Sequence, residues 1–285
     1  MKICRYGDDR LGIVQDGRIY DVTDIQEIIR VSFPYNFEGD PVIAMLKEWT
    51  REVELAGRPS IALADAQLLA PVARPTKLMA APSNYRAHID ETLKDPGIRQ
   101  VARSIDIGEA GIFLKANSSL AGPAQGIVRR FPDRRTDQEG ELVIVIGKKG
   151  SNIPRERALE HVAGYCLGLD MTLRGKEDRS FRKSIDGYSV AGPYLVTADE
   201  IAEPGNLSFE VAVNGEQRQD VNTRNLIYDI PRLIEFASSF YTLHPGDLFF
   251  TGTDQGVGPV EPGDTITLSS ALLGGFSVKV GHDEG

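Results

Sequence analysis

Cysteine, histidine and tryptophan are scarce in this chain of 285 residues, which has two cysteines, four histidines and one tryptophan. Two cysteines are too few for a disulfide framework in a chain of this size. The histidines, at positions 88, 161, 244 and 282, lack the spacing of a zinc site built from histidine and cysteine. A metal site would therefore use oxygen ligands, which suit Mg²⁺, Mn²⁺ or Ca²⁺.

Positive charge is in the minority, because 32 Lys and Arg stand against 41 Asp and Glu and give a formal net charge of −9. An acidic balance repels a polyanion, so we expect no nucleic-acid partner. The longest strongly apolar run, 142–146, is far too short to span a membrane. The first residues are charged where a secretory signal needs an apolar stretch, so we expect a cytoplasmic protein without membrane association.

Glycine is abundant, with 29 residues, and turn dipeptides separate many short predicted strands. Strands are predicted at 2–6, 11–15, 18–21, 77–81, 112–116, 139–147, 164–172, 192–196, 208–214, 248–251 and 264–268. Helices are predicted at 41–56, 86–94, 154–162 and 229–240. Since strands outnumber helices without alternating regularly with them, we predict a strand-rich α+β fold. Prolines at 71 and 75 indicate a linker between a small domain, 1–73, and a larger one, 74–285.

The most informative run joins acidic residues to the apolar segment 142–146. Asp137, Glu139 and Glu141 alternate in the sequence, so a strand would place them on one face. Close carboxylates repel one another unless a cation or a proton intervenes. Asp170 ends a second apolar segment and could complete a three-oxygen metal site with Glu139 and Glu141. The alternative is an acidic, solvated start of a strand.

His88 and Glu91 form a candidate pair for acid–base chemistry. On a helix their spacing places them on one face, where the carboxylate can orient the imidazole as a water-activating base. An exposed helical ion pair would give the same spacing. Lys183 and Lys115 could stabilise an oxyanion or deliver a proton, unless they are ordinary surface lysines. The glycine-rich segment 249–259 lacks the ending of a phosphate loop and is either a substrate-lining loop or a sharp turn.

Several short motifs, in this order, resemble the fumarylacetoacetate hydrolase superfamily over roughly residues 70–281. They include Asn84-Tyr85-x-x-His88-x-x-Glu91, Phe113-x-Lys115, Glu139-x-Glu141, Asp170-x-Thr172-x-Arg174, Lys183-Ser184-x-Asp186 and Thr251-Gly252-Thr253. The resemblance implies a catalytic domain built as a mixed β-sheet roll, preceded by a small N-terminal α/β domain and assembled as a homodimer.

The resemblance also implies roles for individual residues. The implied ligands of Mg²⁺, or of Mn²⁺ or Ca²⁺ in its place, are Glu139, Glu141 and Asp170. The implied catalytic residues are His88, Glu91 and Lys183. The residues expected to bind the substrate are Tyr85, Lys115, Arg174, Glu177 and Thr253. The chain departs from common family residues at 81–83, Leu169, Gly175 and Glu177, which concerns substrate specificity more than chemistry.

We therefore expect a metal-dependent hydrolase that cleaves the C3–C4 bond of a 2,4-dioxo acid of the acylpyruvate type. His88 would take a proton from the water that attacks the 4-oxo carbon, releasing pyruvate as an enolate and a second carboxylic acid. In length the chain is similar to family members acting on 2,4-diketo-3-deoxy-L-rhamnonate. The alternatives are decarboxylation of an oxaloacetate-like acid, isomerisation of 2-hydroxyhepta-2,4-diene-1,7-dioate, and a non-catalytic, metal-stabilised module. The polar segment 95–111 is a candidate lid.

Overall fold

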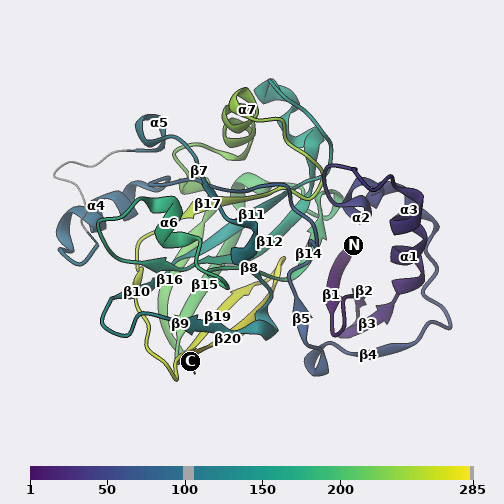
Figure 1. The fold of residues 1–285 in the computed structure, drawn as a ribbon, viewed down its shortest axis with the longest axis horizontal. Helices are drawn as coiled ribbons and strands as arrows, with labels where there is room; N and C mark the ends of the chain where they lie inside the picture. Colours follow the sequence, from purple (N-terminus) through teal and green to yellow (C-terminus); the bar gives the residue numbers. More distant parts are fainter. Residues whose placement is uncertain (99–105, 283–285) are drawn as a thin grey trace.

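Strands dominate the computed structural model, which describes residues 1–98 and 106–282, and the predicted strand-rich α+β class is confirmed (Figure 1). The largest sheet of the described residues has twelve strands. In sheet order its main path is β4 (Ser60–Ala62), β3 (Arg18–Asp21), β2 (Arg10–Gln15), β1 (Lys2–Tyr6), β14 (Ser189–Thr197), β12 (Val162–Asp170), β11 (Gly140–Ile146), β17 (Leu248–Thr253), β6 (Leu78–Ala80) and β7 (Phe113–Lys115). The two strands off this path are β5 (Leu68–Leu69), beside β1, and β8 (Leu120–Ala121), beside β14.

Two smaller sheets complete the strand framework. One contains β13 (Thr172–Leu173), β10 (Thr136–Gln138) and β18 (Gly258–Pro259). The other contains β16 (Glu216–Asn222), β15 (Ser208–Val213), β19 (Thr265–Ser270), β20 (Gly274–His282) and β9 (Ile127–Arg129). Neither β16 nor β20 was predicted from the sequence.

The helices agree with the predictions at some places and differ at others. The α-helices are α1 (Thr23–Ser32), α2 (Pro41–Ala44), α3 (Leu46–Glu52), α4 (Arg86–Lys94), α5 (Ile107–Ala110), α6 (Arg179–Lys183) and α7 (Ile230–Phe240). The 3₁₀ helices are η1 (Leu63–Asp65), η2 (Asn117–Ser119), η3 (Pro123–Gln125), η4 (Arg155–His161), η5 (Ala198–Glu200), η6 (Pro204–Asn206) and η7 (Thr223–Asn225). The predicted helix at 86–94 is α4. The helix predicted at 154–162 is the 3₁₀ helix η4, in which only Ala158 and His161 are buried, too few to form an α-helical apolar stripe.

Strand β11 is buried on both of its faces, as its unbroken apolar sequence predicted. Leu142, Ile144 and Ile146 belong to one hydrophobic core. Val143 and Val145 point to the opposite face and belong to a second core, which α1, α2 and α3 cover (Figure 1). The acidic residues at the start of β11 are therefore fixed in position by a strand that packs on both sides.

The N-terminal segment is joined to the rest of the chain through a shared sheet, because β1 pairs with β14. The buried carboxylate of Asp40 reinforces the connection by accepting hydrogen bonds from the backbone N–H groups of Ala73 and Arg74, at 2.9 and 3.1 Å. The domain boundary near residue 74 stays a prediction. Residues 99–105, in the middle of the predicted lid, lie outside the described residues. In the described part of the chain, no helix combines the length and apolar character needed to cross a membrane.

Candidate metal centre and active site

Three buried carboxylates meet where β11 begins and β12 ends. Glu139 directly precedes β11, Glu141 is the second residue of β11, and Asp170 is the last residue of β12. The two strands are antiparallel, with Gly140 opposite Leu169, which brings these positions to the same end of the sheet. One ligand oxygen from each of the three carboxylates lies within 4.8 Å of the others. The structure therefore brings together the three predicted metal ligands.

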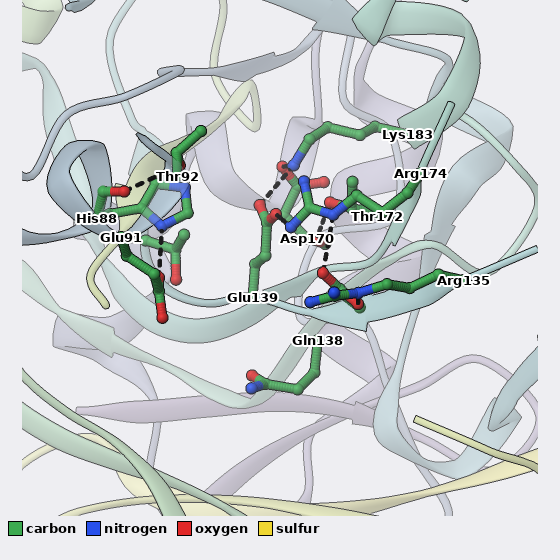
Figure 2. Close-up of polar contacts among 12 residues, drawn as sticks. His88, Glu91, Thr92, Arg135, Gln138, Glu139, Asp170, Thr172, Arg174 and Lys183 are labelled. Carbon is green, nitrogen blue, oxygen red and sulfur yellow. Dashed lines mark hydrogen bonds and ion pairs between the residues drawn. The ribbon is translucent and has the colours of Figure 1, made fainter. Parts of the chain in front are cut away.

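Two buried lysines contact this cluster, and Figure 2 shows one of them, Lys183. Lys183 Nζ donates to Glu139 Oε2 and Asp170 Oδ2, both at 2.6 Å. Lys115 Nζ contacts the other oxygen of Asp170 and donates to the Tyr188 carbonyl at 3.0 Å. Burial alone would lower the pKa of Lys183, but the charges of Asp170 and Glu139 outweigh it and raise that pKa. Burial dominates at Lys115 and lowers its pKa.

Glu141 differs from the other two carboxylates because no described residue forms an ion pair with it. Its Oε2 accepts a hydrogen bond from the Gly252 N–H at 2.7 Å. Burial, together with the charges of Asp170 and Glu139, raises the pKa of Glu141 well above its ordinary value. At Glu139 burial would also raise the pKa, but Lys183 and Arg174 hold it below the ordinary value. Three oxygen donors, one of them without a cationic partner, fit a hard divalent cation.

His88 and Glu91 form the predicted pair on α4. His88 Nδ1 lies 3.1 Å from Glu91 Oε2 (Figure 2). An ionised carboxylate only accepts hydrogen bonds, so this contact places the imidazole proton on Nδ1 and leaves the lone pair on Nε2. Glu91 Oε1 in turn accepts from the Gly256 N–H at 2.8 Å. Gly256 has φ +93°, and a Cβ there would lie 1.9 Å from the Arg218 carbonyl oxygen, so the contact requires glycine.

The turn before α4 is anchored by Asn84, the first residue of the predicted motif. Its side-chain Nδ2 donates to the carbonyls of Tyr228 and Thr251, at 3.0 and 2.8 Å, and its Oδ1 accepts from the Tyr228 N–H at 2.7 Å. Ser83 has φ +49°, a left-handed conformation that residues other than glycine rarely adopt. These contacts fix where α4 starts and therefore where His88 points.

His88 and the carboxylate cluster line one cavity of about 290 Å³, whereas Glu91 contacts His88 without lining that cavity. Figure 2 shows His88 across from Glu139, Asp170 and Lys183. Arg174 also lines the cavity. Its guanidinium bridges Asp137 Oδ2 at 2.8 Å and Glu139 Oε1 at 2.9 Å. The remaining lining includes Glu141 and Thr253.

Three predicted substrate-binding residues are not part of this lining. Tyr85 is buried, and its hydroxyl has no hydrogen-bond partner among the described residues. Lys115 is buried and contacts Asp170 of the cluster. Glu177 is exposed and forms a two-pronged ion pair with Arg134, with both N–O distances at 2.9 Å. Contact of these residues with the substrate stays a prediction.

Two buried polar residues near the site, Gln219 and Asp254, were not predicted. Gln219 on β16 connects the strand that carries the carboxylate cluster to the loop after β17. Its Oε1 accepts from the Gly140 N–H at 2.8 Å, and its Nε2 donates to Thr253 Oγ1 and the Asp254 carbonyl, both at 2.9 Å. Burial and the charge of Glu91 raise the pKa of Asp254. Gln219 therefore holds in register the strand that carries the carboxylates and the loop that supports Glu91.

We expect Gln219→Ala to lower the free energy of unfolding by about 1–3 kcal/mol and kcat by about tenfold or more, because it leaves the Gly140 N–H buried without a partner and releases the loop. Urea unfolding and steady-state kinetics measure the two effects. Gln217→Ala, on the same strand but exposed, is the matched control and should stay within about 0.5 kcal/mol of wild type. Unchanged unfolding and kinetics in Gln219→Ala would contradict this role.

Comparison with known proteins gives consistent matches. A model of the family described as fumarylacetoacetate (FAA) hydrolase, C-terminal, matches residues 77–280. A maleylpyruvate hydrolase of Aquipseudomonas alcaligenes is 49% identical, with 98% of this chain and 99% of that protein covered. The crystal structure of a maleylpyruvate hydrolase from Sphingobium sp. SYK-6, in complex with manganese(II) and pyruvate, has a TM-score of 0.84 at 35% identity and full coverage of both chains. A 5-carboxymethyl-2-hydroxymuconate delta-isomerase from Mycobacterium smegmatis has a TM-score of 0.72 at 29% identity, covering 99% of this chain and 100% of that one.

Proposed function

Because the chain belongs to the fumarylacetoacetate hydrolase family, we propose that it is a metal-dependent hydrolase that cleaves a C–C bond in an acylpyruvate. The observation that carries this proposal is the shared cavity, which His88, hydrogen-bonded to Glu91, lines together with the carboxylate cluster. A base that activates water and a site for a cation are the two parts that such a hydrolysis needs. Maleylpyruvate, the substrate named for two relatives, is the first candidate.

Glu139, Glu141 and Asp170 would hold the divalent cation. Bound there, the cation would supply Lewis-acid chemistry that polarises carbonyl groups and stabilises negative charge on oxygen. We propose Mg²⁺ for this role, with Mn²⁺ as a functional replacement, since both prefer oxygen ligands.

The residues of the chain carry the proton and charge movements. His88 Nε2 takes a proton from a water molecule, and the resulting hydroxide adds to the 4-oxo carbon of the substrate. The C3–C4 bond then breaks, and its electron pair leaves with the three-carbon fragment as the enolate of pyruvate. The other fragment leaves as a carboxylic acid, and a proton added at C3 completes pyruvate. Lys183 places its positive charge where the enolate develops.

An isomerase or decarboxylase is the second candidate, and the similarity to the Mycobacterium smegmatis isomerase is the observation that favours it. Such an enzyme would use the same cluster and an enolate but no attacking water. The hydrogen-bonded His88–Glu91 pair supports the hydrolase, because it is arranged to remove a proton from water. The products separate the two: a second carboxylic acid for the hydrolase, CO₂ or a product of unchanged mass for the alternative.

The test is a panel of acylpyruvates incubated with the protein and Mg²⁺ or Mn²⁺. We expect one pyruvate and one second acid per substrate consumed, loss of turnover with EDTA, and recovery when the cation is restored. Absence of cleavage across the panel would contradict the proposal. Extensive unfolding in EDTA, with no turnover under any condition, would instead support a metal-stabilised structural module.

We further propose a homodimer that acts in the cytoplasm, as the family resemblance of the sequence suggests. Light scattering of the purified protein measures the assembly, and a monomeric mass at micromolar concentration would contradict the dimer. A 2,4-diketo-3-deoxy sugar acid stays a prediction as an alternative substrate and belongs in the same panel.

A further inference from the structure

The short helix α6 supplies three cationic side chains to the wall of the cavity. Arg179, Arg182 and Lys183 occupy positions i, i+3 and i+4, which share one face of a helix, and all three line the cavity. Phe181, from the same helix, is 72% exposed and lies on the outer side. An apolar ring in solvent and three cations turned inward are the reverse of ordinary amphipathic burial, which indicates that the inward face receives an anionic ligand.

Among the described residues, four cationic side chains line the cavity, and three of them are held by other groups of the chain. Arg174 pairs with two carboxylates, and Lys183 does the same. Arg182 donates to the carbonyls of Glu177 and Leu173, at 2.9 and 2.8 Å. These contacts fix the side chains in place and satisfy much of their hydrogen-bonding capacity.

Arg179 is the exception among the described residues. None of them forms an ion pair or a hydrogen bond with its half-buried guanidinium, which lies 5.6 Å from the ring centre of Phe113. Lys183 Nζ lies 5.8 Å from the centre of the same ring. Arg179 and Lys183 therefore contact one ring, and a group bound by Arg179 would be a short carbon chain away from the carboxylate cluster. A seven-carbon chain with an acid at each end spans roughly 7 Å.

The charge balance of the site favours a substrate with two negative groups. Lys115, Lys183 and Arg174 already offset buried carboxylates, and Glu141 remains for a divalent cation. With that cation bound, the unpaired guanidinium leaves the cavity positively charged. A second anionic group on the substrate would neutralise it, because the planar guanidinium binds a carboxylate through two parallel hydrogen bonds.

We propose that Arg179 binds the distal carboxylate of a dicarboxylic acylpyruvate and thereby sets the preference for dianionic over monoanionic substrates. This inference rests on the proposed hydrolase function. It makes Arg179 a specificity-determining residue, while the bond-breaking steps belong to other residues.

Binding of two inert ligands to the metal-loaded protein tests the proposal without turnover. 2-Oxoheptanedioate carries a distal carboxylate and 2-oxoheptanoate lacks it, and neither has the 4-oxo group that is cleaved. We expect Arg179→Gln to weaken the dicarboxylate about tenfold to a hundredfold in calorimetry and to leave the monocarboxylate within about twofold. Arg179→Lys should recover only part of the loss, since a lysine cannot form the two-pronged contact.

Lys176→Gln is the matched control, because it removes one positive charge from an exposed position near the same helix. It should leave both ligands unchanged, which separates a direct contact from a general field effect. Equal weakening of both ligands in Arg179→Gln, or weakening of neither, would overturn the proposal.

Kinetics distinguish this failure from failure of the proposed function. We expect kcat/KM of Arg179→Gln to fall for maleylpyruvate and to stay within about threefold for acetylpyruvate. If wild type hydrolyses both substrates equally and Arg179→Gln does the same, the proposed role of Arg179 is wrong and the hydrolase function is still supported. If wild type turns over no acylpyruvate, both the hydrolase function and this inference are contradicted.

Discussion

Replacing Glu141 by glutamine should abolish metal-dependent turnover, lowering kcat by about a thousandfold or more, while the metal-free protein stays folded. The carboxylate has no cationic partner among the described residues and is close to two others of the same charge, so its removal relieves repulsion. Glutamine keeps an oxygen that can accept the Gly252 N–H. The loss of several kcal/mol of transition-state stabilisation follows from losing the cation.

Thermal unfolding with and without Mn²⁺ separates these effects. Wild type should be stabilised by about 2.7 kcal/mol at a Mn²⁺ concentration one hundred times Kd, and Glu141→Gln should show almost no stabilisation. Without metal, Glu141→Gln should unfold at the same temperature as wild type or at a higher one. Glu203→Gln, which changes an exposed carboxylate, is the control and should behave as wild type. Strong Mn²⁺ stabilisation of Glu141→Gln would contradict the assignment of this ligand.

Replacing His88 by alanine should lower kcat by about 10²–10⁴-fold and leave metal binding within about threefold of wild type. The imidazole is the base in this account, and it contacts Glu91 rather than the carboxylate cluster. Glu91→Gln should lower kcat by a smaller factor, about tenfold, because it removes only the carboxylate that orients the ring. The double variant should be no slower than His88→Ala alone, since an orienting group has no effect without its base.

Stopped-flow kinetics and metal calorimetry on the same samples measure both quantities. His282→Ala, at an exposed position, is the matched control. Full hydrolysis by metal-loaded His88→Ala would show that another group activates the water. Loss of metal binding in His88→Ala would show that this histidine acts on the cluster instead.

The parts of the fold that were predicted correctly have local sequence signals. Strand β11 is an unbroken apolar run, and α4 combines a turn with helical spacing. Strand β20 buries Phe276, Val278 and Val280 in alternation, but glycines at 274, 275 and 281 weaken its strand signal. Helix α1 was not predicted, although Ile25, Ile28 and Ile29 recur at helical spacing and Ile29 is buried.

The residues of the candidate site also differ in whether they could be predicted from the sequence. Glu139, Glu141 and Asp170 could be predicted because carboxylates beside buried strands need a counter-charge. Gln219 could not be predicted, since an inward-facing polar residue on β16 has a role only once three segments distant in sequence meet around it. Arg179 was equally hidden, because a helix of five residues is too short for periodicity to show which side faces a cavity.

Mass spectrometry of the products formed in H₂¹⁸O tests most directly whether the protein hydrolyses the C–C bond. The purified protein with Mn²⁺ and maleylpyruvate should yield pyruvate and a four-carbon diacid in equal amounts, with one ¹⁸O from the attacking water in the new carboxylate of the diacid. Release of CO₂, a product of unchanged mass, or a diacid without ¹⁸O would contradict hydrolysis by the His88–Glu91 pair.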